Sequence, residues 1–315
     1  MLVMLPAVMA VVVRLAPALQ ENAAVAMAAS FISYGIVGWV AAVVLAGIAL
    51  LRGRRSRAAL VITAISVAGL VIQGSWLMPT LVRDTRPIAD DQLRVVSLNM
   101  LAGQADTDQV ARHARYADVL VLVEITPSAE QALVAAGVAR WLPYRIGRSV
   151  PGTQGTMVWS KWPLSDTSPI PGNFGQWLTR ARTPIGPVTV AGVHPCNPLC
   201  GTDAWLQDGK ALAQAVRPGL TGPMIVAGDF NSVDDHPPMR DLYATGLRGA
   251  DDLAGTGWQP TYPSGQKVGG IGIPPMIEID HILLSPRLTA TSYDTFTVPG
   301  TDHLGVTARI GLVQS

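Results

Sequence analysis

Charged residues are scarce in this chain of 315 residues: Asp, Glu, Lys and Arg make up only 14% of it, while 49% of the residues are hydrophobic. Ordinary soluble domains carry about 25% charged residues. The shortage argues against a protein that is soluble throughout its length. Cysteine is nearly absent too, with two residues, which excludes a small disulfide-stabilised scaffold. The length is enough for one or two domains with sizeable cores.

An excess of positive charge is also missing. The formal net charge is +1, and residues 92–315 carry 16 Lys and Arg against 18 Asp and Glu, a net charge of −2. Proteins that bind nucleic acid usually present a strong basic field. The composition therefore does not favour a nucleic-acid partner.

Charge is absent altogether from two long apolar segments, Ala23–Leu51 and Ala58–Val82. A membrane-spanning helix needs about 20 such residues. We therefore predict a membrane region over residues 1–83, with spans at about 28–51 and 58–80.

The stretch 1–19 leaves alternatives open. Pro6, Pro17 and the charge of Arg14 interrupt it, and a charge near the middle of a bilayer is costly. It is a third span or a cleaved signal peptide, although no charged region precedes the apolar run as signal peptides require. The true start of the protein also remains open.

Basic residues fill the link between the two predicted spans: Arg52, Arg54, Arg55 and Arg57. Loops rich in Lys and Arg normally stay in the cytoplasm. We therefore expect a multi-pass protein of the cell membrane whose chain lies on the outer side after about Arg86.

The segment 84–91 has no apolar run and is predicted to be a linker, so that a second domain covers residues 92–315. Short apolar runs bounded mostly by Gly, Pro, Asp or Asn predict buried strands in this domain. Helical patterns opened by Asp or Ser caps lie between some of them. Together they predict an α/β sandwich with helices covering sheets. The predicted strands are Leu93–Leu98, Val119–Val123, Thr156–Trp159, Val188–Val193, Met224–Ala227, Ile277–Leu284 and Leu304–Leu312, and the helices are Asp106–Tyr116, Ser128–Ala136, Ala204–Val216 and Pro238–Thr245.

Polar residues stand at or near the ends of these strands. Each of them alone is most simply explained as a turn residue. A whole series of them is typical of a catalytic site, because catalytic groups gather on loops that a rigid scaffold positions. The series is Asn99, Glu124, His194, Asp229, Asn231, Asp280, Asp302 and His303.

Six motifs occur in a fixed order, and they carry a resemblance to a known family: SLNM at 97–100, LVEITP at 122–127, GVHP at 192–195, GDFN at 228–231, IDHILLS at 279–285 and TDHLGV at 301–306. From about residue 93 onward the chain resembles the endonuclease/exonuclease/phosphatase superfamily. The membrane segment before that domain, together with GDFNSVDDHPPMR and WQPTYP, is similar to VanJ-type teicoplanin-resistance membrane proteins. The resemblance implies a four-layer αββα sandwich and divalent-metal hydrolysis of phosphoesters.

The resemblance also implies a metal site. Glu124 is expected to hold Mg²⁺, with Mn²⁺ as the other candidate, while Asn99 helps through a water and Asp302 supports the metal region. Mg²⁺ prefers few carboxylates and keeps several waters, so a sparse site is reasonable. In one departure from the family, Leu101 stands where some nuclease members carry an acidic residue.

Five further residues take catalytic roles by the same resemblance. Asp229 is expected to orient or deprotonate the attacking water, and Asn231 to donate a hydrogen bond to a phosphate oxygen. His303, whose tautomer Asp280 fixes, is expected to bind or protonate the phosphate. His194 is expected to stabilise the pentacoordinate phosphate.

Three other residues are candidates on weaker grounds. His236 follows GDFN on a loop that lines the substrate entrance or serves structure only. Cys196 and Cys200 form a disulfide if the domain lies outside the cell. A zinc pair is the alternative, but two further ligands are missing nearby.

The substrate must be inferred from location, because this fold hosts many substrates. An outward-facing site on a short tether faces lipid headgroups, so we expect hydrolysis of a lipid-linked phosphate or pyrophosphate, such as a polyprenyl pyrophosphate of the cell envelope, with a possible link to glycopeptide resistance. The alternatives are a sphingomyelinase-like or phospholipase C-like phosphodiesterase, an extracellular nuclease, and a membrane scaffold with a degenerate site. The sequence leaves the oligomeric state open.

Overall fold

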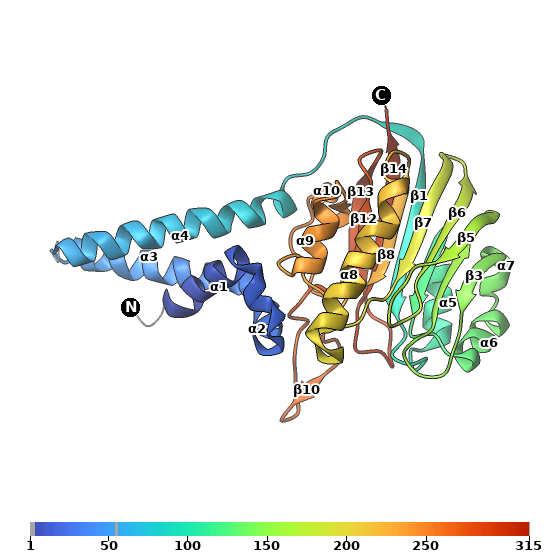
Figure 1. Ribbon diagram of the computed structural model, residues 1–315, viewed down its shortest axis with the longest axis horizontal. Helices are drawn as coiled ribbons and strands as arrows, with labels where there is room; N and C mark the ends of the chain where they lie inside the picture. Colours follow the sequence, from blue (N-terminus) through green and yellow to red (C-terminus); the bar gives the residue numbers. More distant parts are fainter. Residues whose placement is uncertain (1–3, 54–55, 315) are drawn as a thin grey trace. The chain divides into compact units, whose positions relative to one another are not determined.

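The computed structural model describes residues 4–53 and 56–314, which form two compact units (Figure 1). The first unit consists of the chain up to Pro79 together with Asp235–Pro237. The second runs over Thr80–Asp234 and from Pro238 onward. The main part of the first unit therefore ends four residues before the predicted end of the membrane region at residue 83.

The first unit is helical. Two of its helices are long and apolar enough to cross a membrane, one over Ile32–Leu51 and the other over Arg57–Leu81. The predicted spans at 28–51 and 58–80 are close to these bounds. In order, the helices are α1 (Leu5–Leu15), the 3-10 helix η2 (Pro17–Glu21), α2 (Ala23–Ala29), the 3-10 helix η3 (Ile32–Tyr34), α3 (Gly35–Leu51) and α4 (Arg57–Leu81), whose last two residues belong to the second unit.

In its described part, the segment 1–19 holds a short apolar helix, α1, and the start of η2. Helix α1 has 11 residues, about half the length that a span needs. Of the basic link, Arg52 and Arg57 lie in the described chain, while Arg54 and Arg55 lie outside the described residues.

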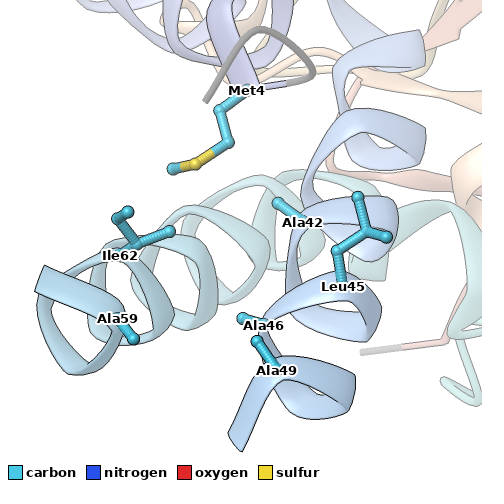
Figure 2. A pocket seen from close by; sticks show the side chains of 7 residues that line it. All are labelled: Met4, Ala42, Leu45, Ala46, Ala49, Ala59 and Ile62. Atoms are coloured by element: carbon cyan, nitrogen blue, oxygen red, sulfur yellow. The ribbon is translucent and has the colours of Figure 1, made fainter. Parts of the chain in front are cut away.

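Small side chains on α3 and α4 leave an apolar cavity of about 210 Å³ within the first unit (Figure 2). None of its side chains carries a charge or a hydroxyl or amide group, so the cavity has no catalytic chemistry. Its lining consists of Met4, Ala42, Leu45, Ala46, Ala49, Ala59 and Ile62.

The predicted linker 84–91 is more ordered than expected. Strand β1 (Ile88–Asn99) begins inside it, and Ile88 pairs with Val313. Asp84 donates its N–H to the Leu253 carbonyl oxygen at 2.9 Å. Its carboxylate also accepts hydrogen bonds from Arg86 Nε at 2.8 Å and Thr289 Oγ1 at 2.7 Å. Backbone pairing and these contacts fix a segment that lacks the apolar side chains by which strands are recognised in a sequence.

In its described residues the second unit holds two six-stranded sheets, ordered β13-β14-β1-β2-β4-β3 and β5-β6-β7-β8-β12-β9. All seven predicted strands are present within them. The remaining strands are β2 (Val119–Val123), β3 (Tyr144–Arg148), β4 (Thr156–Ser160), β5 (Leu164–Pro169), β6 (Trp177–Thr183), β7 (Gly186–Val193), β8 (Met224–Asp229), β9 (Arg248–Gly249), β12 (Asp280–Leu284), β13 (Leu288–Phe296) and β14 (Gly305–Val313), with β10 (Lys267–Val268) and β11 (Ile271–Gly272) as a separate hairpin.

Helices cover the outer face of each sheet, on opposite sides of the sandwich (Figure 1). On one side lie α5 (Thr107–Ala114), α6 (Pro127–Ala135) and α7 (Val138–Trp141), and on the other α8 (Thr202–Val216) and α9 (Pro237–Tyr243). Helix α10 (Ala250–Ala254) packs along the edge of the core, and the short 3-10 helices η4 (Pro198–Cys200) and η5 (Arg217–Gly219) flank α8.

Alternating side chains along the central strands produce these layers. Val95 of β1 and Val190 of β7 belong to the apolar cluster between the sheets, while Val96, the neighbour of Val95, belongs to the cluster on the α5 side. On the second sheet, Val226 belongs to the outer apolar cluster that also contains Leu212 of α8. The predicted four-layer αββα sandwich is confirmed.

Candidate active site

The topology brings the predicted polar residues to one edge of the sandwich. Strands β1 and β2 are parallel, as are β7 and β8, so their carboxyl ends lie together. Strand β12 runs antiparallel to β8, and its first residue, Asp280, pairs with Asp229, the last residue of β8. Strand β14 is likewise antiparallel to β1, which places His303, just before its start, at the same edge.

Asn99 joins two carboxylates at the centre of this edge. Its Nδ2 donates to Glu124 Oε1 at 3.1 Å and to Asp229 Oδ2 at 2.9 Å, while its Oδ1 accepts from the Leu101 N–H at 2.9 Å. The Ala102 N–H donates to the other Glu124 oxygen at 2.8 Å. Two acidic side chains, one directly after β2 and one at the end of β8, are therefore held side by side.

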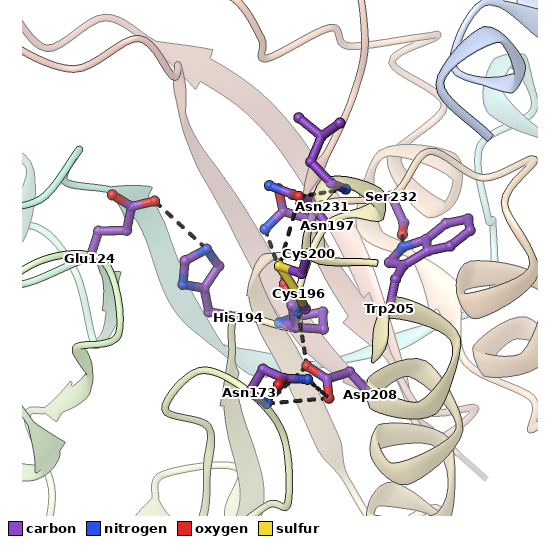
Figure 3. Close-up of a disulfide and its surroundings, with 12 residues drawn as sticks. Glu124, Asn173, His194, Cys196, Asn197, Cys200, Trp205, Asp208, Asn231 and Ser232 are labelled. Atoms are coloured by element: carbon purple, nitrogen blue, oxygen red, sulfur yellow. Dashed lines mark hydrogen bonds and ion pairs between the residues drawn. A yellow bond between two sulfur atoms is a disulfide. The ribbon is translucent and has the colours of Figure 1, made fainter. Parts of the chain in front are cut away.

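His194 lies against the same pair of acids. Its Nε2 is 3.8 Å from Glu124 Oε1 and 3.7 Å from Asp229 Oδ2, and its ring packs 4.8 Å from the ring of Phe174. Figure 3 shows the imidazole directed toward Glu124. Burial lowers the pKa of His194, although Asp229 opposes this shift. The ring is thus a hydrogen-bonding group close to the carboxylates.

His303 and Asp280 form a hydrogen-bonded pair. Nδ1 of His303 lies 2.8 Å from Asp280 Oδ2, and Nε2 lies 3.8 Å from Asp229 Oδ2 and 3.9 Å from Asp302 Oδ1. Burial opposes a charge on His303, but Asp280 and the other two carboxylates outweigh it and raise the pKa of His303 to about 10. With Nδ1 held by Asp280, Nε2 is the nitrogen that faces the site.

Asn231 follows Asp229 in a tight turn. Its N–H donates to Asp229 Oδ1 at 2.8 Å, and its Nδ2 donates to the Pro195 carbonyl oxygen at 3.0 Å. Pro195 precedes Cys196, which is joined to Cys200 by a disulfide (Figure 3). The disulfide thus closes the loop whose carbonyl oxygen positions Asn231.

Unusual backbone geometry occurs at three positions around the site. Glu124 and Asn231 have φ values of +55° and +48°, a region that side chains other than glycine rarely adopt. Gly228 approaches its neighbour so closely that a Cβ would lie 1.9 Å from the Val193 carbonyl oxygen. Such strain is typical of functional sites that the surrounding structure holds in place.

The acids at this edge fit a divalent cation. Burial raises the pKa of Glu124 and, to a lesser extent, so does the charge of Asp229; burial likewise raises the pKa of Asp229. A bound cation would offset the cost of burying these negative charges and the repulsion between the two carboxylates. Hard carboxylate oxygens are the ligands that Mg²⁺ and Mn²⁺ prefer.

Ligand atoms of Asp229, Asp280 and His303 also lie within 4.8 Å of one another, close enough to share an ion. This group differs from the predicted metal residues Asn99, Glu124 and Asp302. Because Asp280 already binds His303 Nδ1, the described contacts leave the two acids joined by Asn99, Glu124 and Asp229, to serve a metal ion and an attacking water. Asn99 directs its nitrogen, not its oxygen, at these acids.

The described contact of His236 lies within the first unit. The residue lies in the segment that groups with the first unit, where its Nε2 is 3.0 Å from the Ala26 carbonyl oxygen. The expected position at the substrate entrance therefore gains no support from its contacts.

Four supporting residues were not predicted. Thr301 Oγ1 donates to the Asn99 carbonyl oxygen at 2.8 Å, and Thr261 Oγ1 accepts from the Asp280 N–H at 3.2 Å. Phe174 packs on His194. Asp208 of α8 accepts the N–H groups of Asn173, just before Phe174, and of Cys196, just after His194 and Pro195. Thr301 stands two residues before His303 in TDHLGV, so its motif was visible, but loop contacts such as those of Asp208 leave no signal in the sequence.

A second group of acids is buried away from the predicted site residues. Tyr243 donates to Asp234 Oδ1 at 2.5 Å, and the Gln259 N–H donates to Glu278 Oε2 at 3.0 Å. Burial, followed by the charge of Asp234, raises the pKa of Asp252 to about 7. Because burial disfavours their charged forms, these acids make the stability of the fold depend on pH.

The family model described as the Endonuclease/Exonuclease/phosphatase family matches residues 96–303, well over half of the chain. Solved structures share the fold. An endonuclease/exonuclease/phosphatase from Beutenbergia cavernae is 19% identical, with 70% of this chain and 72% of that chain covered and a TM-score of 0.53.

Two further structures are similar in fold. D. rerio TDP2, crystallised with a single-strand DNA product, is 15% identical over 70% of this chain and 100% of that chain, with a TM-score of 0.55. SmcL is 15% identical over 70% and 99%, with a TM-score of 0.52. At such identities the likeness shows the fold alone. Among curated proteins, none matches the chain significantly.

Proposed function

This chain belongs to the Endonuclease/Exonuclease/phosphatase family, and from that premise we propose that it hydrolyses a lipid-linked phosphate or pyrophosphate of the cell envelope. Members of the family are metal-dependent hydrolases of phosphoester bonds, so the chain is an enzyme of that class. The lipid substrate, a polyprenyl pyrophosphate in the first instance, is the proposed part.

The observation that carries the lipid substrate is the short connection between an apolar helix and the catalytic unit. Helix α4 ends at Leu81 and β1 begins at Ile88, so six residues that span at most about 20 Å lie between them. The Thr80 carbonyl oxygen also accepts the Gly257 N–H at 2.8 Å. If α4 crosses the membrane, the catalytic unit lies against the lipid headgroups.

In the proposed reaction each residue has a separate task. Asp229 takes the proton of the attacking water, and a pKa raised by burial brings this base closer to neutral pH. Asn231 and His194 donate hydrogen bonds to the phosphate oxygens. The His303–Asp280 pair supplies a proton to the departing oxygen.

Glu124 is the proposed main ligand of the metal ion, with Asn99 and Asp302 in support. The cation supplies positive charge against the negative charge that develops on the phosphate oxygens. Mg²⁺ is proposed as the physiological ion, because it keeps several waters and needs few protein carboxylates; Mn²⁺ is the alternative.

Orientation follows from the basic link. Arg52 and Arg57 flank the break between α3 and α4, and the positive-inside rule keeps such a link in the cytoplasm. The proposed enzyme is therefore a multi-pass membrane protein whose catalytic unit is extracytoplasmic and whose partner is the membrane. A disulfide between Cys196 and Cys200 suits that compartment.

One observation favours a second candidate, a phosphodiesterase that releases a polar headgroup. A cavity of about 460 Å³ adjoins the site, and Asp302 is the only charged residue of its lining in the described chain. A second phosphate prefers a cationic lining, whereas a neutral or positively charged headgroup suits a carboxylate. The lining consists of Leu101, Ser264, Gly265, Gln266, Thr297, Val298, Pro299, Gly300, Thr301 and Asp302.

A nuclease is the third enzymatic possibility, and D. rerio TDP2, with its DNA product, is a fold neighbour. The net charge of −2 on residues 92–315 speaks against it, since phosphate contacts with DNA depend on Lys and Arg. A nuclease reaction should weaken steeply as salt increases.

The test is phosphate release from undecaprenyl pyrophosphate by the full chain in detergent with Mg²⁺, with sphingomyelin and DNA assayed in parallel. Asp229→Ala is the inactive comparison, and a chelator should abolish activity until Mg²⁺ or Mn²⁺ is restored. The proposal is supported if wild type releases phosphate from the pyrophosphate and Asp229→Ala does not. If only sphingomyelin or DNA is hydrolysed, the protein is still a hydrolase, but the proposed lipid-linked pyrophosphate substrate is wrong.

A link to glycopeptide resistance is a further part of the proposal. Expression in a sensitive bacterium should raise the teicoplanin concentration needed to stop growth, and Asp229→Ala should remove that effect. If cells with and without the active enzyme are equally sensitive to teicoplanin, the link to resistance is wrong. The proposed phosphoester hydrolysis is not affected by that result.

A further inference from the structure

The hairpin of β10 and β11 exposes two large apolar side chains. Val268 is 67% exposed and Ile271 is 77% exposed, and the two residues pair directly across the ribbon. Gly269 and Gly270, with φ values of +57° and +84°, form the turn between them. An exposed apolar pair at the tip of a two-stranded ribbon has no core to pack against, and isolated ribbons of this kind are marginal in water.

The composition of the hairpin fits a lipid surface. Residues 264–275 read SGQKVGGIGIPP and contain no acidic residue, with Lys267 as their single charge. Apolar side chains combined with a basic residue favour anionic lipid headgroups.

The base of the hairpin forms one wall of the catalytic edge. Ser264 donates its N–H to the Asp302 carbonyl oxygen at 2.7 Å, and Gln266 and Ser264 both line the cavity beside Asp302. Just before the hairpin, the ring of Tyr262 lies 5.0 Å from that of His303. The base of the hairpin therefore lies next to the cavity and to His303.

If α4 spans the membrane, the chain distance from its end brings this hairpin within reach of the lipid surface. Thr80, near the end of that helix, is bonded to Gly257, and the hairpin begins ten residues later at Lys267. Ten residues reach at most about 35 Å. Trp258, the residue after Gly257, is 37% exposed and is of the type that accumulates at headgroup level.

We propose that the β10–β11 hairpin inserts Val268 and Ile271 into the lipid surface and thereby holds the catalytic edge at the depth of the substrate headgroup. This inference rests on the proposed function in one respect, the membrane location of α4. The occupant of the apolar tip is the bilayer in which the chain itself is anchored.

The first test locates position 271 without using activity. Both native cysteines are joined in a disulfide, so Ile271→Cys introduces a single reactive thiol for an environment-sensitive fluorophore. The full chain is reconstituted into vesicles of phosphatidylglycerol and phosphatidylcholine. We expect a blue-shifted emission, quenching by brominated lipid chains and protection from iodide.

The matched control is Tyr116→Cys, because Tyr116 is 64% exposed at the turn after α5. Its probe should be quenched by iodide and not by brominated lipid. Equal iodide quenching at positions 271 and 116 would overturn the inference. So would protection at position 271 that disappears when the protein is diluted at constant lipid, because a second copy of the chain would then be the occupant.

The second test separates the hairpin from the chemistry. Val268→Ser with Ile271→Ser should lower turnover of a vesicle-borne substrate about tenfold, since two apolar side chains leave the lipid, while hydrolysis of soluble bis-p-nitrophenyl phosphate stays unchanged. Tyr116→Ser is the control and should affect neither. Equal loss on both substrates would show a merely structural hairpin. If wild type hydrolyses no lipid at all, the proposed substrate fails, but the probe at position 271 still decides the inference.

Discussion

Replacing Asp208 by alanine should weaken both the fold and the catalytic step, although Asp208 contacts none of the predicted catalytic residues. Its side chain is 4% exposed. One oxygen accepts Asn173 Nδ2 at 2.9 Å, and the other accepts the N–H groups of Asn173 at 3.1 Å and of Cys196 at 3.0 Å (Figure 3). One carboxylate therefore holds two loops.

Both of these loops position site residues. Asn173 precedes Phe174, whose ring packs on His194, and Cys196 follows Pro195, whose carbonyl oxygen accepts from Asn231. Loss of Asp208 releases the contacts that hold the two proposed phosphate-binding side chains.

The size of the effect follows from the burial of each donor. The Cys196 N–H is buried and loses its partner, at a cost of about 1–3 kcal/mol, whereas Asn173 is exposed and its donors regain water, at about 1 kcal/mol. The free energy of unfolding should therefore fall by about 2–4 kcal/mol. A displacement of reacting groups by about 1 Å costs up to 100-fold in rate, so kcat should fall at least about tenfold.

The assay pairs chemical denaturation of the full chain in detergent with kcat and KM on a soluble phosphodiester. Gln207→Ala is the control, because Gln207 is the exposed neighbour on the same helix, and it should change neither. Asp208→Asn retains one acceptor oxygen and should lie between wild type and Asp208→Ala. An Asp208→Ala protein that loses stability but retains the wild-type kcat would refute the positioning role.

Three further predictions concern stability. Cys196→Ser with Cys200→Ser should lower the free energy of unfolding by roughly 2 kcal/mol, the loop-closure entropy of so short a loop, as measured by denaturation without reductant. Gly228→Ala should cost at least about 3 kcal/mol, because its Cβ would overlap the Val193 carbonyl oxygen; a wild-type melting temperature would contradict this. The pKa of Asp252 is raised from 3.8 to about 7, so the folded state holds its proton more strongly than the unfolded state does. This contribution to the free energy of unfolding is fully present below about pH 4 and is lost as the pH rises through about 7. Asp252→Asn should therefore stabilise the fold by up to roughly 4 kcal/mol at pH 8 and by little at pH 4, and an equal effect at both values would exclude this explanation.

The sequence predicted the strands that are buried on both faces and missed most of those that are not. Central strands such as β2 and β8 are continuous apolar runs, because helices and the other sheet cover both of their faces. Strands β3, β5 and β13 lie at sheet edges, where exposed positions carry polar residues. In β5, LSDTSP contains a single large apolar residue, so its strand character comes from pairing with β6.

The site was predictable to the extent that it depends on strand order. Asn99, Glu124, Asp229 and Asp280 stand at strand ends, and the topology alone brings them together. Their supports were not predictable in the same way, because Asp208 and Phe174 meet the site through loops whose packing has no period in the sequence. His236 stays a prediction: it is close in sequence to GDFN, and its described hydrogen-bond contact is with the Ala26 carbonyl oxygen of the first unit.

The loop from Gly257 to Glu278 connects the end of helix α4 with residues of the candidate active site. At the start of the loop, the Gly257 N–H donates to the Thr80 carbonyl oxygen. Further along, Thr261 Oγ1 accepts the N–H groups of Ile279 and Asp280, each at 3.2 Å. Asp280 in turn fixes the tautomer of His303 through its 2.8 Å hydrogen bond. A displacement of this loop therefore moves the carboxylate that orients the proton donor. We expect substitutions at Thr261 to lower kcat even when substrate binding is retained, because the loop's contact with Asp280 is made through this one hydroxyl.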